Sequence, residues 1–227
     1  MPKLLSPKRT IVSLERMLES FALSWIAIFN DQPKKESLLV LLAQTALESG
    51  RFKSMYNYNL GNIKSTPNDN RDYTFYKCNE ILPIITANKL LQTQKVDGGK
   101  VVITKNIDDK TCVVDFYPNH KYARFRAFET LNEGVVDYLN FIEIKYRPAW
   151  SAVLAGDPVN FVHLLKENHY FTADESQYKK SVSSLHSEFL RLNIDLDNLP
   201  ILSEDTKQNI LNSIQISLQD LSNEIMK

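Results

Sequence analysis

The feature that most limits how this chain can fold is an apolar segment bounded by polar residues. After Ser37, a residue suited to cap a helix N-terminus, the sequence runs Leu-Leu-Val-Leu-Leu-Ala-Gln-Thr-Ala-Leu to Glu48, and Ser49-Gly50 then supplies a helix stop. A helix that is apolar on nearly every side has no face suited to water. We therefore expect a helix from Ser37 to Glu48 at the centre of a domain.

Apolar residues spaced three and four apart predict further helices on both sides of this segment. The clearest run extends from Thr10 to Phe29 and ends at the loop 30–35. Later in the chain we expect helices over 132–144, from Pro148 onward, within 158–168 and over 174–192. After a break at 198–200, an apolar stripe predicts a C-terminal amphipathic helix (residues 200–227, helical from 203), which follows a main domain of residues 1–199. The stripe consists of Ile210, Leu211, Ile214, Leu218, Leu221 and Ile225.

The middle of the chain, about residues 65–126, has a different pattern. Short runs rich in β-branched and aromatic residues lie at 73–76, 100–104 and 112–117, with turns at 98–99 and 108–109. Residues 84–95 favour a short helix within this region. The expected fold class is therefore α+β, mainly α, with a helical body and a small antiparallel β-lobe.

The composition argues against several classes of protein. The 27 basic and 27 acidic residues cancel, so a nucleic-acid partner, which usually needs a basic face, receives no support. The longest apolar run near the N-terminus, residues 21–29, is too short to span a bilayer and is preceded by Glu15 and Glu19, where a signal peptide carries positive charge. We expect a soluble protein made in the cytoplasm, without a signal peptide or a transmembrane segment.

Residues that usually hold a metal or a phosphate are not arranged to do so. The 4 histidines show neither HxxxH nor HExxH spacing, and Cys78 and Cys112 lack CxxC spacing. A glycine-rich phosphate loop is missing, and Ser49 lacks the pattern of a nucleophile elbow. We expect no metal and no cofactor. The two cysteines favour free thiols over a single cross-strand bridge.

Glu48 is the first candidate for chemistry. At the C-terminal end of a buried helix, one turn beyond Gln44, the helix dipole and the apolar surroundings both disfavour the ionised carboxylate and raise its pKa. A general acid needs this property, because it must still hold a proton at neutral pH. The alternative is an ordinary glutamate whose head group reaches solvent where the helix ends.

Four segments extend this observation along the chain. They are Ala43-Gln44-Thr45-Ala46-Leu47-Glu48-Ser49-Gly50; Asn59-Leu60-Gly61-Asn62-Ile63-Lys64; Phe125-Arg126-Ala127-Phe128 with Glu133-Gly134-Val135 and Tyr138-Leu139; and His169-Tyr170-Phe171-Thr172-Ala173-Asp174 with Tyr178. In this order they resemble the motifs of the bacterial glucosaminidases of glycoside hydrolase family 73. The likeness covers about residues 36–190 and departs at Tyr170, where Phe-Thr-Ala-Asp follows in place of Ala-Thr-Asp.

The resemblance implies a lysozyme-like fold with a glycan groove between the helical body and the β-lobe. It implies a peptidoglycan hydrolase of the endo-β-N-acetylglucosaminidase type, which cuts the β-1,4 glycan backbone with Glu48 as its acid and Tyr170 lining the site. From the residues alone, Tyr170 can also be a core tyrosine near a helix start. Asp174 is more consistent with a helix N-cap than with a catalyst.

Glycoside hydrolysis normally needs a second carboxylate, and two candidates lie in the β-lobe. We prefer Glu80, because it is expected to follow a strand into a loop from which it can swing over the groove. Asp115 alternates with apolar neighbours and can simply be the solvent-facing residue of a strand.

Three further residues are candidates for the floor of the groove. The ring of Tyr58, the amide of Asn59 and the ammonium of Lys64 are suited to contact sugar hydroxyls and acetamido groups, and Asp115 is included as a possible substrate contact. The alternatives are that Asn59 only holds a turn and that Lys64 is only solvated.

Other functions stay open on the same motifs. One is a muramidase or lytic transglycosylase, for which a single acid suffices. Another is a non-catalytic glycan-binding component of a phage tail or secretion machine, although such a component has no need of a half-buried acid. Without a signal peptide, delivery to the cell wall, in the periplasm or outside the cell, is expected to depend on a holin or on a secretion system.

Overall fold

The structure, a computed structural model, describes residues 1–171 and 174–192. It is α+β and mainly α, as predicted. The chain divides into two compact units: a β-unit of Met1–Lys8 with Asn62–Ala127, and a helical unit of Arg9–Gly61 with the chain from Phe128 onward. The predicted C-terminal helix over 203–227 lies outside the described residues. Among those described, no helix has the length and apolarity needed to cross a membrane.

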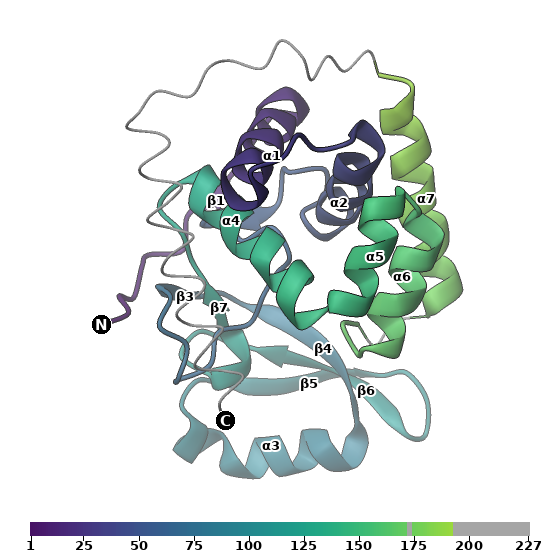
Figure 1. The fold of residues 1–227 in the computed structure, drawn as a ribbon. Coiled ribbons are helices and arrows are strands. Elements are labelled where there is room, and N and C mark those ends of the chain that lie inside the picture. The colour runs from purple at the N-terminus through teal and green to yellow at the C-terminus, as the bar shows by residue number, and fades with distance from the viewer. Residues whose placement is uncertain (172–173, 193–227) are drawn as a thin grey trace. The chain divides into compact units, whose positions relative to one another are not determined.

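The helical unit is built round one buried helix, α2 (Lys35–Glu48). All of its residues from Ser37 to Ala46 are buried, and it packs against α1 (Leu14–Phe29), α5 (Arg147–Ala155) and α7 (Glu175–Leu190) (Figure 1). The central position predicted for this segment is therefore confirmed. The remaining elements of the unit are β1 (Arg9–Thr10), which pairs with β2 (Met55–Tyr56), α4 (Leu131–Asn140), a π-helical turn (Phe141–Lys145) and α6 (Pro158–Glu167).

Two predicted helix starts are wrong. Helix α1 begins at Leu14 and not at Thr10, because the Ser13 side chain accepts a hydrogen bond from the Arg16 amide and caps the helix there. Thr10 belongs instead to strand β1, opposite Met55. Helix α2 begins before Ser37, which lies inside the helix and is 1% exposed.

The β-unit contains two small antiparallel sheets. One has the strand order β4-β6-β5, formed by Cys78–Pro83, Thr111–Phe116 and Val101–Asn106, and the other pairs β3 (Tyr73–Phe75) with β7 (Arg124–Arg126). Helix α3 (Ile84–Asp97) packs on the three-stranded sheet (Figure 1). The core between them consists of Ala87, Leu90, Val101, Cys112, Val114, Phe116 and Ala123.

This unit confirms the three predicted strands and the short helix, but strands β4 and β7 were not predicted. Both cysteines are free, in line with the preferred interpretation. The strand register explains why. Cys112 lies opposite Leu82 while Cys78 lies opposite Phe116, four residues further along β6. At roughly 3.3 Å per residue this offset is about twice the span that a disulfide can bridge.

Candidate active site

Glu48 is the last residue of α2, and the sequence that follows it ends the helix abruptly. The Ser49 hydroxyl donates to the Thr45 carbonyl and accepts from the Phe52 amide at 3.0 Å. Gly50, Arg51 and Phe52 then all have positive φ values, of 55°, 58° and 62°. Such a run of left-handed residues turns the chain away from the helix axis. Glu48 is thereby placed, half-buried, at the end of a buried helix.

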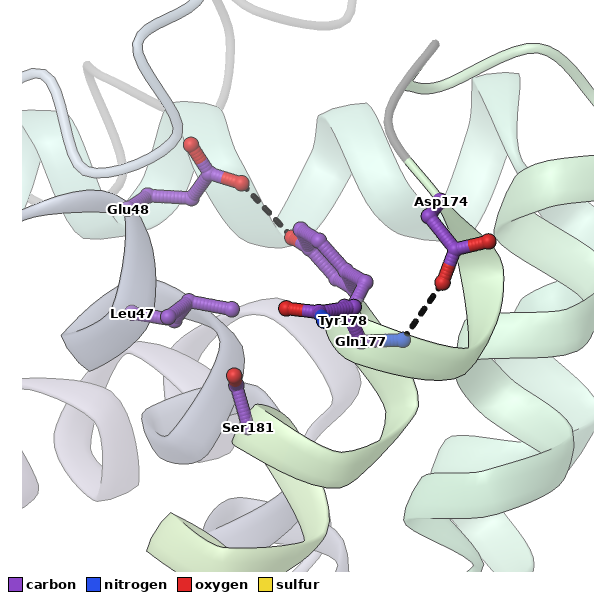
Figure 2. A pocket seen from close by; sticks show the side chains of 6 residues that line it. All are labelled: Leu47, Glu48, Asp174, Gln177, Tyr178 and Ser181. Carbon is purple, nitrogen blue, oxygen red and sulfur yellow. Dashed lines mark hydrogen bonds between the residues drawn. The ribbon is translucent and has the colours of Figure 1, made fainter.

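The Glu48 carboxylate is held by a tyrosine from another helix. Its Oε1 atom accepts a hydrogen bond of 2.6 Å from the Tyr178 hydroxyl of α7 (Figure 2). The Gln44 amide nitrogen, one turn back on α2, lies 3.5 Å from the same oxygen. A short bond from a hydroxyl to a carboxylate is charge-assisted and directional. The carboxylate head is therefore fixed in orientation.

Gln44 in turn is bonded by three tyrosines. Its side chain is fully buried, and its amide nitrogen donates to the hydroxyls of Tyr170 at 3.0 Å and Tyr178 at 3.1 Å. Its carbonyl oxygen accepts from the hydroxyl of Tyr138, a buried residue of α4, at 2.5 Å. The Tyr170 hydroxyl also donates to the Gly61 carbonyl at 3.4 Å. One amide thus links the acid to three elements of the helical unit.

The three tyrosines are held in their neutral form. Burial raises the pKa values of Tyr138, Tyr170 and Tyr178 well above the usual value near 10, and the charge of Glu48 raises them further. Deprotonation of any of them would place a second negative charge beside the carboxylate. They therefore act as hydroxyl donors and acceptors over the physiological pH range.

Aromatic packing supports two of these hydroxyls. The Tyr170 ring meets the Tyr146 ring edge-on, with centroids 5.0 Å apart, and the Phe141 ring at 6.3 Å. The Phe171 ring stacks on the Tyr178 ring with centroids 4.1 Å apart and an interplanar angle of 12°. These contacts limit ring rotation, so the hydroxyls stay where the hydrogen bonds need them.

A pocket of about 570 Å³ opens beside the carboxylate, within the range typical of small-ligand sites. Figure 2 shows the side chains that line it: Leu47, Glu48, Asp174, Gln177, Tyr178 and Ser181. Asp174 is the N-cap of α7 and accepts from the Gln177 amide at 2.9 Å, as predicted. The pocket is open to solvent, and α7 contributes Gln177, Tyr178 and Ser181 to its wall.

Tyr58 and Asn59 lie in the loop after β2, in the same helical unit. Asn57 and Tyr58 have positive φ values of 46° and 52°, which are uncommon for residues other than glycine. Gly134 of α4 leaves room for this loop, since a Cβ atom there would lie 2.1 Å from the Tyr58 carbonyl oxygen. Tyr58 is half-buried, whereas Asn59 is 1% exposed, which favours the alternative that Asn59 holds the turn.

Lys64 and Glu80 form an ion pair in the β-unit. The two side chains are 3.1 Å apart, and the Lys64 ammonium also donates to the Tyr122 carbonyl at 2.6 Å and lies 4.0 Å from the centre of the Phe125 ring. The prediction that Glu80 lies in a loop is wrong. It is in the middle of strand β4, opposite Val114, because residues 78–83 pair with β6 along their whole length.

Asp115 also differs from its alternative interpretation as a solvent-facing strand residue. It is 8% exposed and forms an ion pair of 2.5 Å with Lys77. It lies on the central strand of the sheet, between Asn79 and Val102, so neighbours on both sides shield it. Of the two candidate carboxylates, only Glu80 is well exposed, at 40% of its side chain.

Three residues of the site were not singled out from the sequence: Gln44, Tyr138 and Tyr178. Gln44 offered a signal, because it is a polar residue in the middle of an apolar helix and such a residue must find partners. Tyr138 and Tyr178 lie in the third and fourth of the segments that resemble the family motifs, and that resemblance was their only signal in the sequence. In the part of the chain that the structure describes, no group of three or more His, Cys, Asp or Glu residues is arranged to hold a metal ion.

A carboxyl group fixed by hydrogen bonds at the wall of an open pocket is an arrangement that suits a glycosidase. The family model for glucosaminidase, described as mannosyl-glycoprotein endo-beta-N-acetylglucosaminidase, matches residues 35–190. The chain belongs to this family, and it is a glycoside hydrolase of the endo-β-N-acetylglucosaminidase type that acts on a glycan. Neither the curated proteins nor the solved structures include a match. The family match begins with α2 and ends with α7.

Proposed function

We propose that the chain hydrolyses the β-1,4 bond after N-acetylglucosamine in the glycan strands of peptidoglycan, with Glu48 as the general acid. The observation that carries the proposal is the hydrogen bond that the Tyr178 hydroxyl donates to Glu48 at the wall of the pocket. A bond that ends in an alcohol leaving group breaks readily only if a proton reaches the departing oxygen. Glu48 is oriented to supply that proton.

Two observations support peptidoglycan over a glycoprotein as the substrate. The helix segment at 43–50 and the loop at 59–64 resemble the motifs of the bacterial glucosaminidases, which act on cell walls. The pocket is also open, as a long polymer threading past the acid requires, and does not enclose a chain end.

We assign the second carboxylate role, activation of the attacking water, to Glu80. A base for water must be reached by solvent, and the side chain of Glu80 is 40% exposed while that of Asp115 is 11% exposed. Tyr58 and Lys64, both half-buried, are the proposed sugar contacts. We assign to Tyr170 the role of holding the hydrogen-bonded group round Glu48, because its hydroxyl bonds Gln44 and Gly61.

The test is mass spectrometry of the fragments released from purified peptidoglycan, reduced after digestion so that the new reducing-end sugar is marked. We expect reduced N-acetylglucosamine at the new ends. Reduced N-acetylmuramic acid would identify a muramidase, and an anhydro sugar would identify a lytic transglycosylase. Release of glycans from a high-mannose glycoprotein, with intact peptidoglycan left unchanged, would overturn the proposed substrate.

The matched variant for this assay is Glu48→Gln, which keeps the shape of the side chain but cannot donate a proton. We expect a folded protein with no measurable wall lysis. The control is Glu36→Gln, an exposed residue in the first turn of the same helix, which should keep full activity. Lysis at a near-normal rate by folded Glu48→Gln protein would overturn the mechanism.

A further inference from the structure

Gln44 is a fully buried polar residue of the candidate active site, and it does not face the pocket. It is 0% exposed, and the residues that line the pocket do not include it. Its amide has a carbonyl oxygen that accepts and an NH₂ group that donates, and both form hydrogen bonds with tyrosine hydroxyls. Burial of an amide is costly unless each group is bonded, and here the bonds extend toward the acid.

The direction of each hydrogen bond follows from the chemistry of the amide. The Tyr138 hydroxyl donates to the Gln44 carbonyl oxygen, which places the NH₂ group toward Tyr170 and Tyr178. With the amide reversed, its oxygen would lie 3.5 Å from the Glu48 carboxylate oxygen and repel it. The Glu48 carboxylate therefore fixes which way the amide points, and the Tyr138 hydroxyl supplies the donor that the amide oxygen needs in that orientation.

The fixed amide then determines the direction in which the hydroxyl protons of Tyr170 and Tyr178 point. Because each accepts a proton from Gln44, its own proton must point elsewhere. The Tyr170 proton points to the Gly61 carbonyl, and the Tyr178 proton points to Glu48 Oε1. A carboxylic acid whose Oε1 accepts such a bond carries its own proton on Oε2.

We propose that Gln44 is a positioning residue for catalysis: with its carbonyl oxygen bonded by Tyr138, its amide holds the Tyr178 hydroxyl in the orientation that donates to Glu48, and so fixes which oxygen of the acid carries the transferable proton. The proposal rests on the proposed function, in which Glu48 is the acid. Gln44 itself touches no substrate. Its effect is exerted mainly through Tyr178, because its own hydrogen bond to Glu48 is long, at 3.5 Å.

The proposal has a consequence for the pH dependence of the acid. A hydrogen bond donated to a carboxylate stabilises its ionised form, so loss of the bond moves titration of Glu48 to higher pH. Titratable groups face Glu48 from several elements: Tyr138 from α4, Tyr170 from the α6–α7 connection, Tyr178 from α7, and Asp174 across the pocket. Because the tyrosines stay neutral, they change the acid through hydrogen bonds.

The experiment measures the titration midpoint of the Glu48 carboxyl carbon by ¹³C NMR, with the signal assigned by its absence in Glu48→Gln protein. Tyr178→Phe removes the donor outright and should raise the midpoint by about one pH unit. Gln44→Met keeps the length of the side chain but removes the amide, and should shift the midpoint in the same direction. Tyr138→Phe removes only the donor to the Gln44 carbonyl oxygen, which leaves the amide less firmly held, and should give a smaller shift of the same sign.

A kinetic measurement accompanies the titration. In the pH–rate profile of each variant, the alkaline limb, where the acid loses its proton, should move upward with the NMR midpoint. For Gln44→Met, kcat should fall while KM stays unchanged, because the amide does not contact the glycan.

The matched control is Thr45→Val, at the next position of the same helix. Thr45 is also 0% exposed, but its hydroxyl bonds only the Leu41 and Leu42 carbonyls of its own helix. This variant loses a buried hydrogen bond without touching the tyrosines, so it should lower stability slightly and leave the midpoint where it is.

A folded Gln44→Met protein with the wild-type midpoint would overturn the proposal, since a purely structural role for Gln44 predicts lower stability without a shift. If Gln44→Met does not fold, Tyr138→Phe decides in the same way, and an unchanged midpoint overturns the proposal. The NMR titration needs no substrate. Failure of the proposed function would appear as activity in Glu48→Gln, a result that the titration does not depend on.

Discussion

The β-unit contains a buried ion-pair cluster whose loss should be costly. Asp69 bonds two arginines through its two carboxylate oxygens, to Arg71 at 3.0 Å and to Arg126 of β7 at 2.8 Å. The exposed fractions of the three side chains are 2%, 4% and 3%. In Asp69→Asn both arginines keep their charge but lose the carboxylate charge that faces them.

The expected loss follows from this burial. Removal of one partner from a buried ion pair typically costs about 3–5 kcal/mol, because the remaining charge is left uncompensated. For a chain of this size each kcal/mol lowers Tm by about 2–4 °C, so Asp69→Asn should melt roughly 6–20 °C below the wild type. The exposed Asp109→Asn, on the turn between β5 and β6, removes the same charge and should leave Tm nearly unchanged.

The pH dependence adds a second signature. Burial alone raises the pKa of Asp69, but the charges and hydrogen bonds of Arg126 and Arg71 outweigh it and hold the pKa below the ordinary value. The carboxylate therefore stabilises the fold fully above the unfolded-state pKa of about 3.9, and this contribution is lost as pH falls through the lowered folded-state pKa. The stability difference between wild type and Asp69→Asn should shrink over that acidic range.

The assay is thermal and urea unfolding followed by far-UV circular dichroism at neutral pH and at several acidic pH values. Tryptophan fluorescence alone is unsuitable, because both tryptophans, Trp25 and Trp150, lie in the helical unit. If Asp69→Asn lowers the free energy of unfolding by less than about 1 kcal/mol at neutral pH, as little as Asp109→Asn does, the reasoning is refuted. Such a small loss is typical of solvent-exposed ion pairs and not of buried ones.

Two further predictions concern the loop of the helical unit and the second carboxylate. Gly134→Ala should destabilise the protein by about 1–3 kcal/mol in urea unfolding, because the new Cβ would lie 2.1 Å from the Tyr58 carbonyl oxygen; intrinsic helix propensity predicts the opposite sign, so a stabilised variant would contradict the contact. Glu80→Gln should lose far more wall-lysis activity than Asp115→Asn, while both still bind glycan in a pull-down with insoluble wall. The reverse ranking would transfer the role to Asp115, and equal, mild losses would indicate a mechanism with a single acid.

Helices and strands whose apolar residues recur at a regular spacing could be predicted from the sequence. Elements that depend on pairing with residues distant in the sequence could not. The helices repeat apolar residues every three or four positions, and each one that falls within the described residues was found to within a few residues. Strand β4, Cys-Asn-Glu-Ile-Leu-Pro, contains residues that disfavour strands and is stabilised by pairing with β6. The placement of Glu80 failed for this reason, since a weak local pattern was interpreted as a loop.

Local sequence features place Glu48 at the end of a buried helix, but they do not identify most of the side chains that form hydrogen bonds around it. Glu48 follows from local features, namely a buried helix and a helix stop. The partners of Gln44 are separated from it by 94, 126 and 134 residues along the chain, for Tyr138, Tyr170 and Tyr178. No periodicity or spacing rule reaches across such distances, so the hydrogen-bonded group becomes visible only in the folded chain.

The hydrogen-bonded group also gives a physical reason why four separate segments carry the family resemblance. The first segment supplies Gln44, the second supplies the Gly61 carbonyl, the third continues to Tyr138, and the fourth supplies Tyr170 and Tyr178. A buried amide is tolerated only when all of its hydrogen bonds are made, so a change in any one segment leaves a polar group unsatisfied in the core of the helical unit. Substitutions that look unrelated in the sequence should therefore be coupled. Double-mutant cycles of Gln44→Met with Tyr138→Phe should show a non-additive loss of stability, whereas Gln44→Met combined with a change in the β-unit such as Asp109→Asn should be additive.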